Sequence, residues 1–463
     1  GLASFLRPAQ AQVFRFEDTP VPKRNSLSAH YVFYVYSEED APDTSLGPAQ
    51  IEFRDLHPTS LSRSRSQADL EDYQGLQVSI LPYFDFWNFL DPDKFCSTAE
   101  DVRTNAADNQ DQILVRKEEG HMPHFSHTVR FNQDDSEPVQ LTTSGAYVLV
   151  YSNCGSFDEA SLTGQVVVRS AYGHLPGIEY YKMPLYRWLV VVYGVLLLIW
   201  LALVLRWWKD VFYIHSGITT VIVLGVVESL LWLTVYEELN ATGIRRKPIF
   251  FAAILSSVLK SVFAYVLVLV AALGSGVVRS DLGASTSMKV HAMALLFIVL
   301  DFGKAGVMAF NYSHALKLPF LLMSAIPVVL LHASIFYWIF MALASLLEQL
   351  QDDERMQPFA KMRNLLVLAL VGAACITIIQ LFDVSSTRVS LWKFHWLIAD
   401  GLPQGLFVLV LLRAICIWAP TASTKRFAEM QLPQLGRKNK RGYRSVPNAE
   451  AIGAVDDDGG MIL

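Results

Sequence analysis

The pattern of apolar and polar residues divides the chain near residue 180. Before this point, short runs with alternating apolar and polar residues are separated by turn residues, which is typical of strands with one buried face. Several such strands in succession predict an antiparallel β-sandwich. The Ser- and Arg-rich stretch from His57 to Gln74 is expected to be a mobile loop. The strand-like runs are residues 30–36, 51–53, 76–80, 147–151 and 165–168.

After about residue 185 the alternation gives way to long apolar stretches. A helix needs about 20 apolar residues to cross the hydrocarbon core of a bilayer, and seven stretches are suitable, although the sixth is short. The fifth contains Pro327, which predicts a kink. The expected fold is therefore an N-terminal antiparallel β-sandwich followed by an all-α bundle of seven transmembrane helices. The expected spans are Leu185–Leu205, Ser216–Tyr236, Ile249–Gly274, Lys289–Phe310, Pro319–Leu347, Asn364–Leu381 and Leu391–Trp418.

These patterns give three parts: a sandwich domain at 1–180, a helix bundle at 181–420 and a tail at 421–463. The tail is polar, first basic and then acidic, and such composition predicts disorder. It contains Tyr443-Arg-Ser-Val446, a Tyr-x-x-apolar string of the kind that sorting adaptors bind, and it ends in Ile462-Leu463, which resembles a dileucine signal. The sorting candidates are therefore Tyr443, Val446, Ile462 and Leu463, and a merely solvating tail is the alternative.

Composition supports a membrane protein. The 463 residues are 52% hydrophobic and 17% charged, against about 25% charged in a typical soluble protein. A wholly soluble enzyme and a disordered protein are therefore excluded, and the net charge of −5 gives no indication of nucleic-acid binding. The sequence lacks the H-E-x-x-H, G-x-S-x-G, Walker A and G-x-G-x-x-G motifs, so we expect neither enzymatic activity nor a cofactor.

Charges and glycosylation sequons orient the chain in the membrane. If the C-terminus is cytosolic, the loops give seven Lys and Arg residues to the cytosol and six to the lumen, and the basic tail tips the balance. The N-terminus is then lumenal. The sequons at Asn240 and Asn311 both fall in lumenal loops, which makes them glycosylation candidates. Both lie close to the membrane, so an absence of glycan at either is the alternative.

Two further features concern the N-terminal part. Ala9-Gln10-Ala11 follows a short apolar stretch and resembles the end of a secretory signal peptide, with an ordinary N-terminal segment as the alternative. In an oxidising lumen, Cys96 and Cys154 are expected to form a disulfide rather than remain free thiols.

His121, His124 and His127 form an H-x-x-H-x-x-H string that could hold a metal ion or titrate at mildly acidic pH. Exposed histidines in a turn are the simpler interpretation. On a strand this spacing places neighbouring histidines on opposite faces, so we expect no metal site.

Five charged residues lie inside the expected spans. Counted at the α-helical rise from the lumenal helix ends, all five are roughly 9–16 Å deep. An unpaired charge there costs at least about 2.5–3.5 kcal/mol, so the five should face one another or water. We predict a polar cavity open to the lumen, with interhelical ion pairs that only fix packing as the alternative. Matched depth also predicts direct or water-mediated pairing of Glu228 with Lys260. The cavity candidates are Glu228, Lys260, Asp301, Lys304 and Asp400.

Several segments, in the right order, resemble the GOLD-domain seven-transmembrane family, also called lung seven-transmembrane receptors, and its transmembrane protein 87 branch. The stretch 144–155 is similar to the last strands of the family's GOLD domain, and 172–176 with Pro184-Leu-Tyr186 is similar to its junction with the membrane. The helices contribute Asp210, Glu228, Asn240-Ala-Thr-Gly243, Ser257, Lys260, Gly274-Ser-Gly-Val-Val278, Leu282-Gly283, Trp338-Ile-Phe340, Leu343, Trp418-Ala-Pro420 and Arg426-Phe-Ala428. Departures from the family pattern are Ser275, Ser280-Asp281, His332 and Ala419, and the first 140 residues match poorly.

The resemblance implies a lumenal GOLD-like sandwich, a seven-helix bundle and residence in Golgi or endosomal membranes. It also implies a role in the trafficking of membrane or secreted cargo proteins, with sorting adaptors as partners of the tail. A cation channel or a lipid-binding transporter, with a phospholipid in the bundle, is the second function class, and a signalling receptor is the third.

Overall fold

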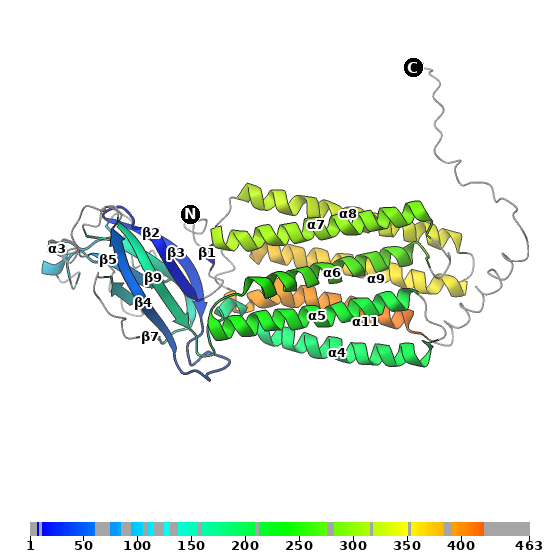
Figure 1. Cartoon of the computed structure of the whole chain (residues 1–463), viewed down its shortest axis with the longest axis horizontal. Coiled ribbons are helices and arrows are strands. Elements are labelled where there is room, and N and C mark those ends of the chain that lie inside the picture. The colour runs from blue at the N-terminus through cyan, green and yellow to red at the C-terminus, as the bar shows by residue number, and fades with distance from the viewer. Residues whose placement is uncertain are drawn as a thin grey trace, which may run out of the picture.

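The structure is a computed structural model with a β-domain at one end of a bundle of long helices (Figure 1). It describes residues 7–8, 12–60, 75–84, 94–104, 107, 109–114, 125–129, 138–155, 160–208, 213–275, 282–314, 318–350, 353–383 and 391–420.

The β-domain is a sandwich of two sheets. One sheet has the strand order β1-β3-β8-β5-β6 and the other has the order β2-β9-β4-β7. All pairings are antiparallel except the two-residue pairing of β1 with β3. The strands are β1 (Arg7–Pro8), β2 (Val13–Pro20), β3 (Ser26–Val35), β4 (Ala49–Ser60), β5 (Leu76–Pro82), β6 (Phe125–Thr128), β7 (Val139–Leu141), β8 (Gly145–Asn153) and β9 (Ala160–Arg169).

Each predicted strand run overlaps an observed strand, although the run 30–36 extends one residue past the end of β3. The loop predicted at residues 57–74 begins inside a strand. Residues 57–60 belong to β4, because a bulge between Arg54 and His57 restores the pairing of β4 with β9 as far as Ser60. Asp55 adopts a positive φ of 48° within this bulge. Residues 61–74, the rest of the predicted loop, lie outside the described part of the chain.

Strands β3 and β8 contribute side chains to two hydrophobic cores, because successive residues of a strand point to opposite faces of the sheet. On β3, Phe33 and Val35 point into the core between the two sheets, whereas Val32 and Tyr34 belong to a cluster that continues into the helix bundle. Strand β8 alternates in the same way and is buried along its whole length. This sheet therefore has no solvated face at its membrane end, and the sandwich packs directly on the bundle.

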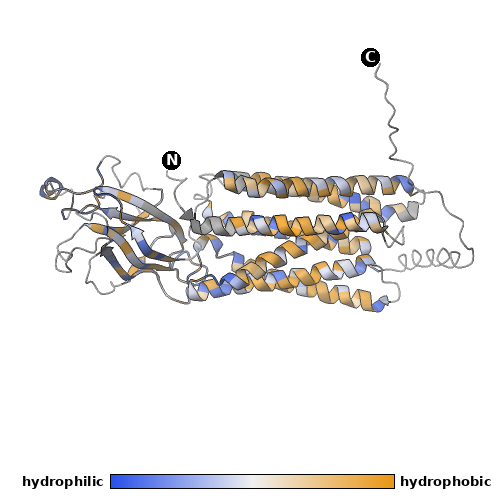
Figure 2. Ribbon diagram, turned by 45° about the horizontal axis from the view of Figure 1, so that its top comes forward, coloured by the Kyte–Doolittle hydropathy of each residue, from blue (hydrophilic) through white to orange (hydrophobic). Residues whose placement is uncertain are grey.

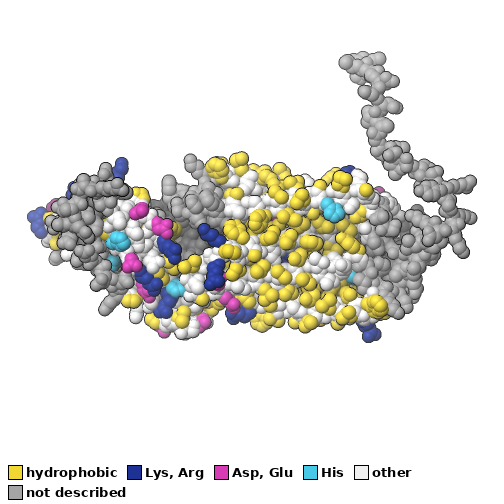
Figure 3. Space-filling model, viewed as in Figure 1, with side chains coloured by type: hydrophobic (Ala, Val, Ile, Leu, Met, Phe, Trp, Pro, Cys, Tyr) yellow, Lys and Arg dark blue, Asp and Glu magenta, His cyan; other side chains and the backbone are white. Residues whose placement is uncertain are grey.

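Seven helices or helix groups are long and apolar enough to cross a membrane. Their apolar middle sections and polar ends are visible in Figure 2. On the face drawn in Figure 3, apolar side chains predominate over the bundle, and charged residues gather on the sandwich and at the bundle ends. The protein is a multi-pass membrane protein. The helices are α4 (Lys182–Arg206), α5 (Tyr213–Thr242), α6 (Lys247–Ala272), α7 (Ala284–His314), α8 (Leu318–Gln349), α9 (Asp353–Asp383) and α11 (Leu402–Trp418).

The seventh span is composite. Before α11 come a 3₁₀ turn, η4 (Trp392–Phe394), and a π-helical segment, η5 (Leu397–Gly401), so the span runs from Trp392 to Trp418. The sixth helix is longer than predicted, because its first turns contain charged residues and Pro358. We call the bundle end next to the sandwich the sandwich side and the opposite end the far side.

Candidate functional site

A buried polar triad joins three helices at the centre of the bundle. Lys260 on α6 forms an ion pair with Glu228 on α5, and both residues are at most 3% exposed. Gln404 on α11 bridges the two: its Oε1 accepts a hydrogen bond from Lys260 Nζ at 3.0 Å, and its Nε2 donates to Glu228 Oε1 at 3.3 Å. The opposite charges of Lys260 and Glu228 neutralise each other, and either charge alone would be costly to bury.

The hairpin of α5 and α6 sets the level of this triad. Glu228 and Lys260 lie about equally far, roughly 20 Å at the α-helical rise, from the sandwich-side ends of their antiparallel helices. Gly225 leaves room for the Tyr193 ring of α4, which a Cβ at this position would approach to 2.5 Å. Lys260 Nζ then lies 5.7 Å from the centroid of that ring and 4.2 Å from the Phe407 centroid, so aromatic faces also stabilise the ammonium.

A second charged group lies closer to the sandwich. Asp400 forms an ion pair with Lys182 at 2.8 Å and accepts a hydrogen bond from the Tyr186 hydroxyl at 3.2 Å. Lys182 Nζ is also 3.8 Å from the Glu179 carboxylate, which Arg245 contacts at 3.1 Å. Lys182 therefore stands between two carboxylates, one at the base of the sandwich and one on the seventh span.

The π-helical segment η5 places both Asp400 and Gln404. In this register the N–H of Leu402 donates to the carbonyl of Leu397, five residues earlier. The next donor would serve Ile398, but residue 403 is proline and has no N–H. The Gln380 side chain of α9 donates to the Ile398 carbonyl instead, at 3.1 Å.

Asn240, in the last turn of α5, joins the bundle to the sandwich. Its Nδ2 donates to the carbonyl of Tyr172 at 2.8 Å, and its Oδ1 accepts from the N–H of Leu175 at 3.2 Å. Its main-chain carbonyl accepts from the N–H of His174 at 2.9 Å. Gly173 has a φ of 136°, and any Cβ there would collide with Asn240. The amide nitrogen that would carry a glycan on Asn240 donates this hydrogen bond to Tyr172, so the junction disfavours the predicted glycosylation.

An aromatic cluster completes the junction. The Trp392 ring packs against Tyr36 and Tyr34, with centroids 4.6 and 5.7 Å apart, and Tyr172 packs on Tyr180 at 4.2 Å. Burial raises the pKa of Tyr36 well above its usual range, so its hydroxyl stays neutral. Beside the cluster, Lys393 contacts Asp40 at 3.3 Å.

Comparison with known proteins adds the family. The family model described as "GOST, seven transmembrane domain" matches residues 181–425, which is more than half of the chain. The chain belongs to this family. The matched region contains the triad, Lys182 and Asp400, whereas the sandwich lies outside it.

Curated relatives point to the transmembrane protein 87 branch of the GOST family. Transmembrane protein 87A of Xenopus tropicalis is 27% identical over 307 residues, which cover 64% of this chain and 55% of that protein. Transmembrane protein 87B of Mus musculus is 26% identical over 270 residues, covering 56% and 47%. Transmembrane protein 87A of Homo sapiens is 27% identical over 307 residues, covering 63% and 54%. The chain thus spans about half the length of the curated relatives it matches.

Within this GOST bundle, the five predicted cavity residues separate into three groups. Glu228 and Lys260 pair with each other, Asp400 pairs with Lys182, and Asp301 pairs with Lys304 on α7 at 3.4 Å. These residues therefore form three separate ion pairs, each carboxylate with its own lysine. The cavity open to the lumen stays a prediction. Sequence reasoning missed Lys182 and Gln404, one because it precedes the expected span and the other because it is uncharged.

The structure confirms the predicted disulfide of the N-terminal part and describes one of its three predicted histidines. Cys96 and Cys154 form the predicted disulfide, with Cα atoms 5.3 Å apart. His127 stacks on Phe53 with centroids 4.6 Å apart, while His121 and His124 lie outside the described residues. Within the part of the chain that the structure describes, no group of three or more His, Cys, Asp or Glu side chains could hold a metal ion.

The second glycosylation candidate and the sorting candidates lie near or beyond the ends of the described segments. Asn311, expected in a loop, lies within the last turns of α7, because that helix continues to His314. The sorting candidates Tyr443, Val446, Ile462 and Leu463 lie outside the described residues.

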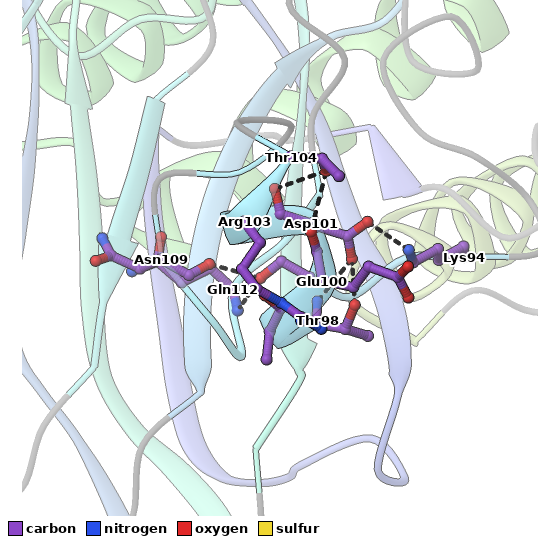
Figure 4. A network of polar contacts seen from close by, with 10 residues as sticks. Lys94, Thr98, Glu100, Asp101, Arg103, Thr104, Asn109 and Gln112 are labelled. Atoms are coloured by element: carbon purple, nitrogen blue, oxygen red, sulfur yellow. Dashed lines mark hydrogen bonds and ion pairs between the residues drawn. The ribbon is translucent and has the colours of Figure 1, made fainter.

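A polar network close in sequence to Cys96 surrounds the short helix α3 (Ala99–Arg103) (Figure 4), which lies at the end of the sandwich farthest from the bundle (Figure 1). Helix α3 begins at Thr98, whose N–H and hydroxyl donate to the Asp101 carboxylate, both at 2.7 Å. Lys94 contacts the same carboxylate at 2.5 Å. Hydrogen bonds from Lys94 and Thr98 lower the pKa of Asp101 to about 2. The tip is thus ordered by its own contacts rather than by the bundle.

Proposed function

We propose that this protein is a Golgi or endosomal membrane protein that assists the trafficking of other membrane or secreted proteins. The observation that carries the proposal is the fixed sandwich. Asn240, Trp392 and the Glu179–Arg245 ion pair hold it against the bundle, while its ordered tip points away. A recognition domain held in this way can present bound cargo at a constant height above the membrane.

The proposed orientation places the sandwich in the lumen and the C-terminus in the cytosol. The Cys96–Cys154 disulfide supports this orientation, because such bonds persist in oxidising compartments. The basic residues after Trp418 support it through the positive-inside rule. Protease protection in sealed Golgi vesicles tests it: epitopes on the sandwich should be protected and epitopes on the C-terminus digested. The reverse pattern would contradict the orientation.

Cells that lack the protein provide the test of trafficking. Quantitative mass spectrometry of the secreted and cell-surface fractions should find a defined set of proteins delayed, and re-expression of the full chain should restore them. A variant with Tyr443→Ala, Ile462→Ala and Leu463→Ala should shift towards the cell surface and fail to restore them. Unchanged secreted and surface fractions in the absence of the protein would refute the trafficking role.

A second candidate, a cation channel or lipid-binding transporter, is favoured by the interior of the bundle. Beside the triad, the buried hydroxyls of Tyr193 and Ser256 have no hydrogen-bond partner among the described residues. Buried polar groups normally have partners, so water, an ion or a lipid headgroup is the expected occupant. Purified protein in liposomes tests this function. Cation flux or co-purified phospholipid that is lost in the Glu228→Gln, Lys260→Met double variant supports it, and unchanged flux and lipid content would contradict it.

A further inference from the structure

We infer that α11, together with the π-helical segment η5, is a movable element that transmits a change at the base of the sandwich to the far side of the bundle. The inference goes beyond the proposed function and does not depend on whether the protein carries cargo or conducts ions. It rests on how α11 is attached, on what holds its two ends, and on the geometry of η5.

Helix α11 packs against α9, where Leu406 lies beside Gly372, and it is joined to α5 and α6 mainly by polar contacts. Only Leu411 and Ile415 of its residues are buried, whereas α5 and α6 bury long apolar stripes against each other and their neighbours. Its contacts with α5 and α6 include the Gln404 bridge at the triad, the Phe407 ring beside Lys260 and a hydrogen bond at its last residue. On this side of α11 a few directional contacts can exchange partners, whereas a close-packed interface resists displacement.

The two ends of the seventh span are held by different parts of the molecule. On the sandwich side, Trp392 is packed against Tyr34 and Tyr36 of the sandwich. On the far side, the carbonyl of Trp418 accepts a hydrogen bond from His215 Nε2 at 2.9 Å, and the Phe359 ring of α9 packs against Trp418 edge-on. A displacement of the sandwich base therefore moves Trp392 at the start of the span. If the span moves with it, the contacts of Trp418 with His215 and Phe359 on the far side change as well.

A change of η5 from the observed π-register to an α-register would give a second arrangement. A π-turn contains one residue more than an α-turn, and an α-helix turns by about 100° per residue. A change of η5 to the α-register would therefore rotate Asp400 by about this angle relative to Gln404. The ion pair with Lys182 and the bridge to Lys260 could then not both persist. Lys182 has Glu179 as a second carboxylate within 3.8 Å, so its charge stays compensated when Asp400 leaves. Switching elements commonly have this property of two alternative sets of partners.

Distance measurements between spin labels test the inference on the full chain in nanodiscs. Cys375 and Cys416, the free cysteines of the described helices, are replaced by alanine, and the disulfide is kept. One label pair joins the exposed positions Leu409 on α11 and Val223 on α5. A reference pair joins Val223 and Phe263 on α6, also exposed. Trp392→Ala perturbs the base of the sandwich, and Lys182→Met perturbs the link to Asp400.

Controls match each perturbation. Phe53→Ala removes an equally buried aromatic ring that contacts the sandwich core and not the bundle, and Lys182→Arg keeps the charge. We expect Trp392→Ala and Lys182→Met each to shift or broaden the Leu409–Val223 distance by about 2–5 Å, with the reference pair and both controls unchanged. Should Trp392→Ala fail to fold, Lys182→Met tests the same element without altering the sandwich. An unchanged Leu409–Val223 distance in the folded variants, or an equal change in the reference pair, would overturn the inference.

Discussion

Lys260 and Glu228 form an ion pair in the middle of the membrane-spanning bundle, and each is almost completely shielded from solvent. The pair joins α5 to α6, and through Gln404 it also joins both helices to α11. The two charges compensate each other only while α5 and α6 keep their relative heights, and the hydrogen bonds of Gln404 persist only while α11 keeps its height as well. Loss of either charge leaves the other buried without a partner, which is the costly outcome for a buried pair.

A double-mutant cycle measures this coupling. We expect Glu228→Gln and Lys260→Met singly to destabilise the bundle by about 3–5 kcal/mol each, and the double variant to lose less than the sum by at least about 1 kcal/mol. Thermal unfolding in detergent is the measurement. The exposed pair Arg187–Glu237 is the control, and its coupling should not exceed about 1 kcal/mol. Additive losses at Glu228 and Lys260 would show that the two charges are not coupled.

Asn240 is expected to carry no glycan, because its amide is engaged by Tyr172 and Leu175. Asn240→Ala should lower stability by about 1–3 kcal/mol, since it leaves a buried carbonyl and N–H unpaired. Thr242→Val removes the same sequon but keeps the amide. It loses only the exposed hydrogen bonds of the Thr242 hydroxyl with Glu238 and Ile244, so it should cost less stability than Asn240→Ala and leave electrophoretic mobility unchanged. Glycopeptide mass spectrometry that finds a glycan on Asn240 would refute the junction geometry.

Local patterns and helical rise predicted much of this architecture. Alternation located β3, β4, β5, β8 and β9 because each has a face in a core, and the α-helical rise matched the depths of Glu228 and Lys260 because α5 and α6 form a simple hairpin. Strands β1, β2, β6 and β7 were not predicted. Strands β1, β6 and β7 have only two, four and three residues, too few for alternation to be recognised. Strand β2 was missed although Phe14 and Phe16 alternate with exposed or half-exposed residues.

The second charged level could not be predicted by the same reasoning. Lys182 lies at the start of α4, outside the apolar stretch that marks the span, although Glu179 three residues earlier was a usable signal for an i, i+3 pair. Pro403 is the one feature of the sequence that indicates the π-register of η5. The orientation of Asp400 towards Lys182 depends on tertiary contacts, which the sequence pattern does not reveal. Depth alone grouped Asp301 and Lys304 with the others, because it carries no information about which side a residue faces.

The Cys96–Cys154 disulfide should stabilise the sandwich by about 2–4 kcal/mol, the usual range for a loop of this size. Cys96→Ser with Cys154→Ser should lower the melting temperature of the sandwich and release the α3 tip, while the melting of the helix bundle stays the same. Circular dichroism in the strand and helix regions separates the two transitions. Mass mapping without reduction that finds both thiols free in the native protein would contradict the bond.

Protonation of Asp101 should loosen the α3 tip only at strongly acidic pH. Its pKa is lowered from 3.8 to about 2 in the folded protein, so its contribution is complete above pH 3.8 and is lost as the pH falls through 2. Hydrogen exchange at residues 98–104, corrected for the intrinsic rate, should be constant from pH 5 to 7 and increase below pH 4. Asp101→Asn should abolish that increase and exchange faster throughout. A transition between pH 5 and 7 would show that another group controls the tip.

The hydrogen bond from Gln380 to the Ile398 carbonyl should be necessary only because residue 403 is proline. Gln380→Leu leaves that carbonyl unpaired inside the membrane, and we expect a loss of about 1–3 kcal/mol. Pro403→Ala supplies a main-chain N–H that the π-register directs at the same carbonyl. The double variant should therefore recover part of the loss. Thr377→Val, on an exposed face of the same helix, is the control and should be neutral. Thermal unfolding in detergent measures all four variants. If the double variant is no more stable than Gln380→Leu alone, the N–H at residue 403 does not reach the Ile398 carbonyl, and the proposed exchange of donors is wrong.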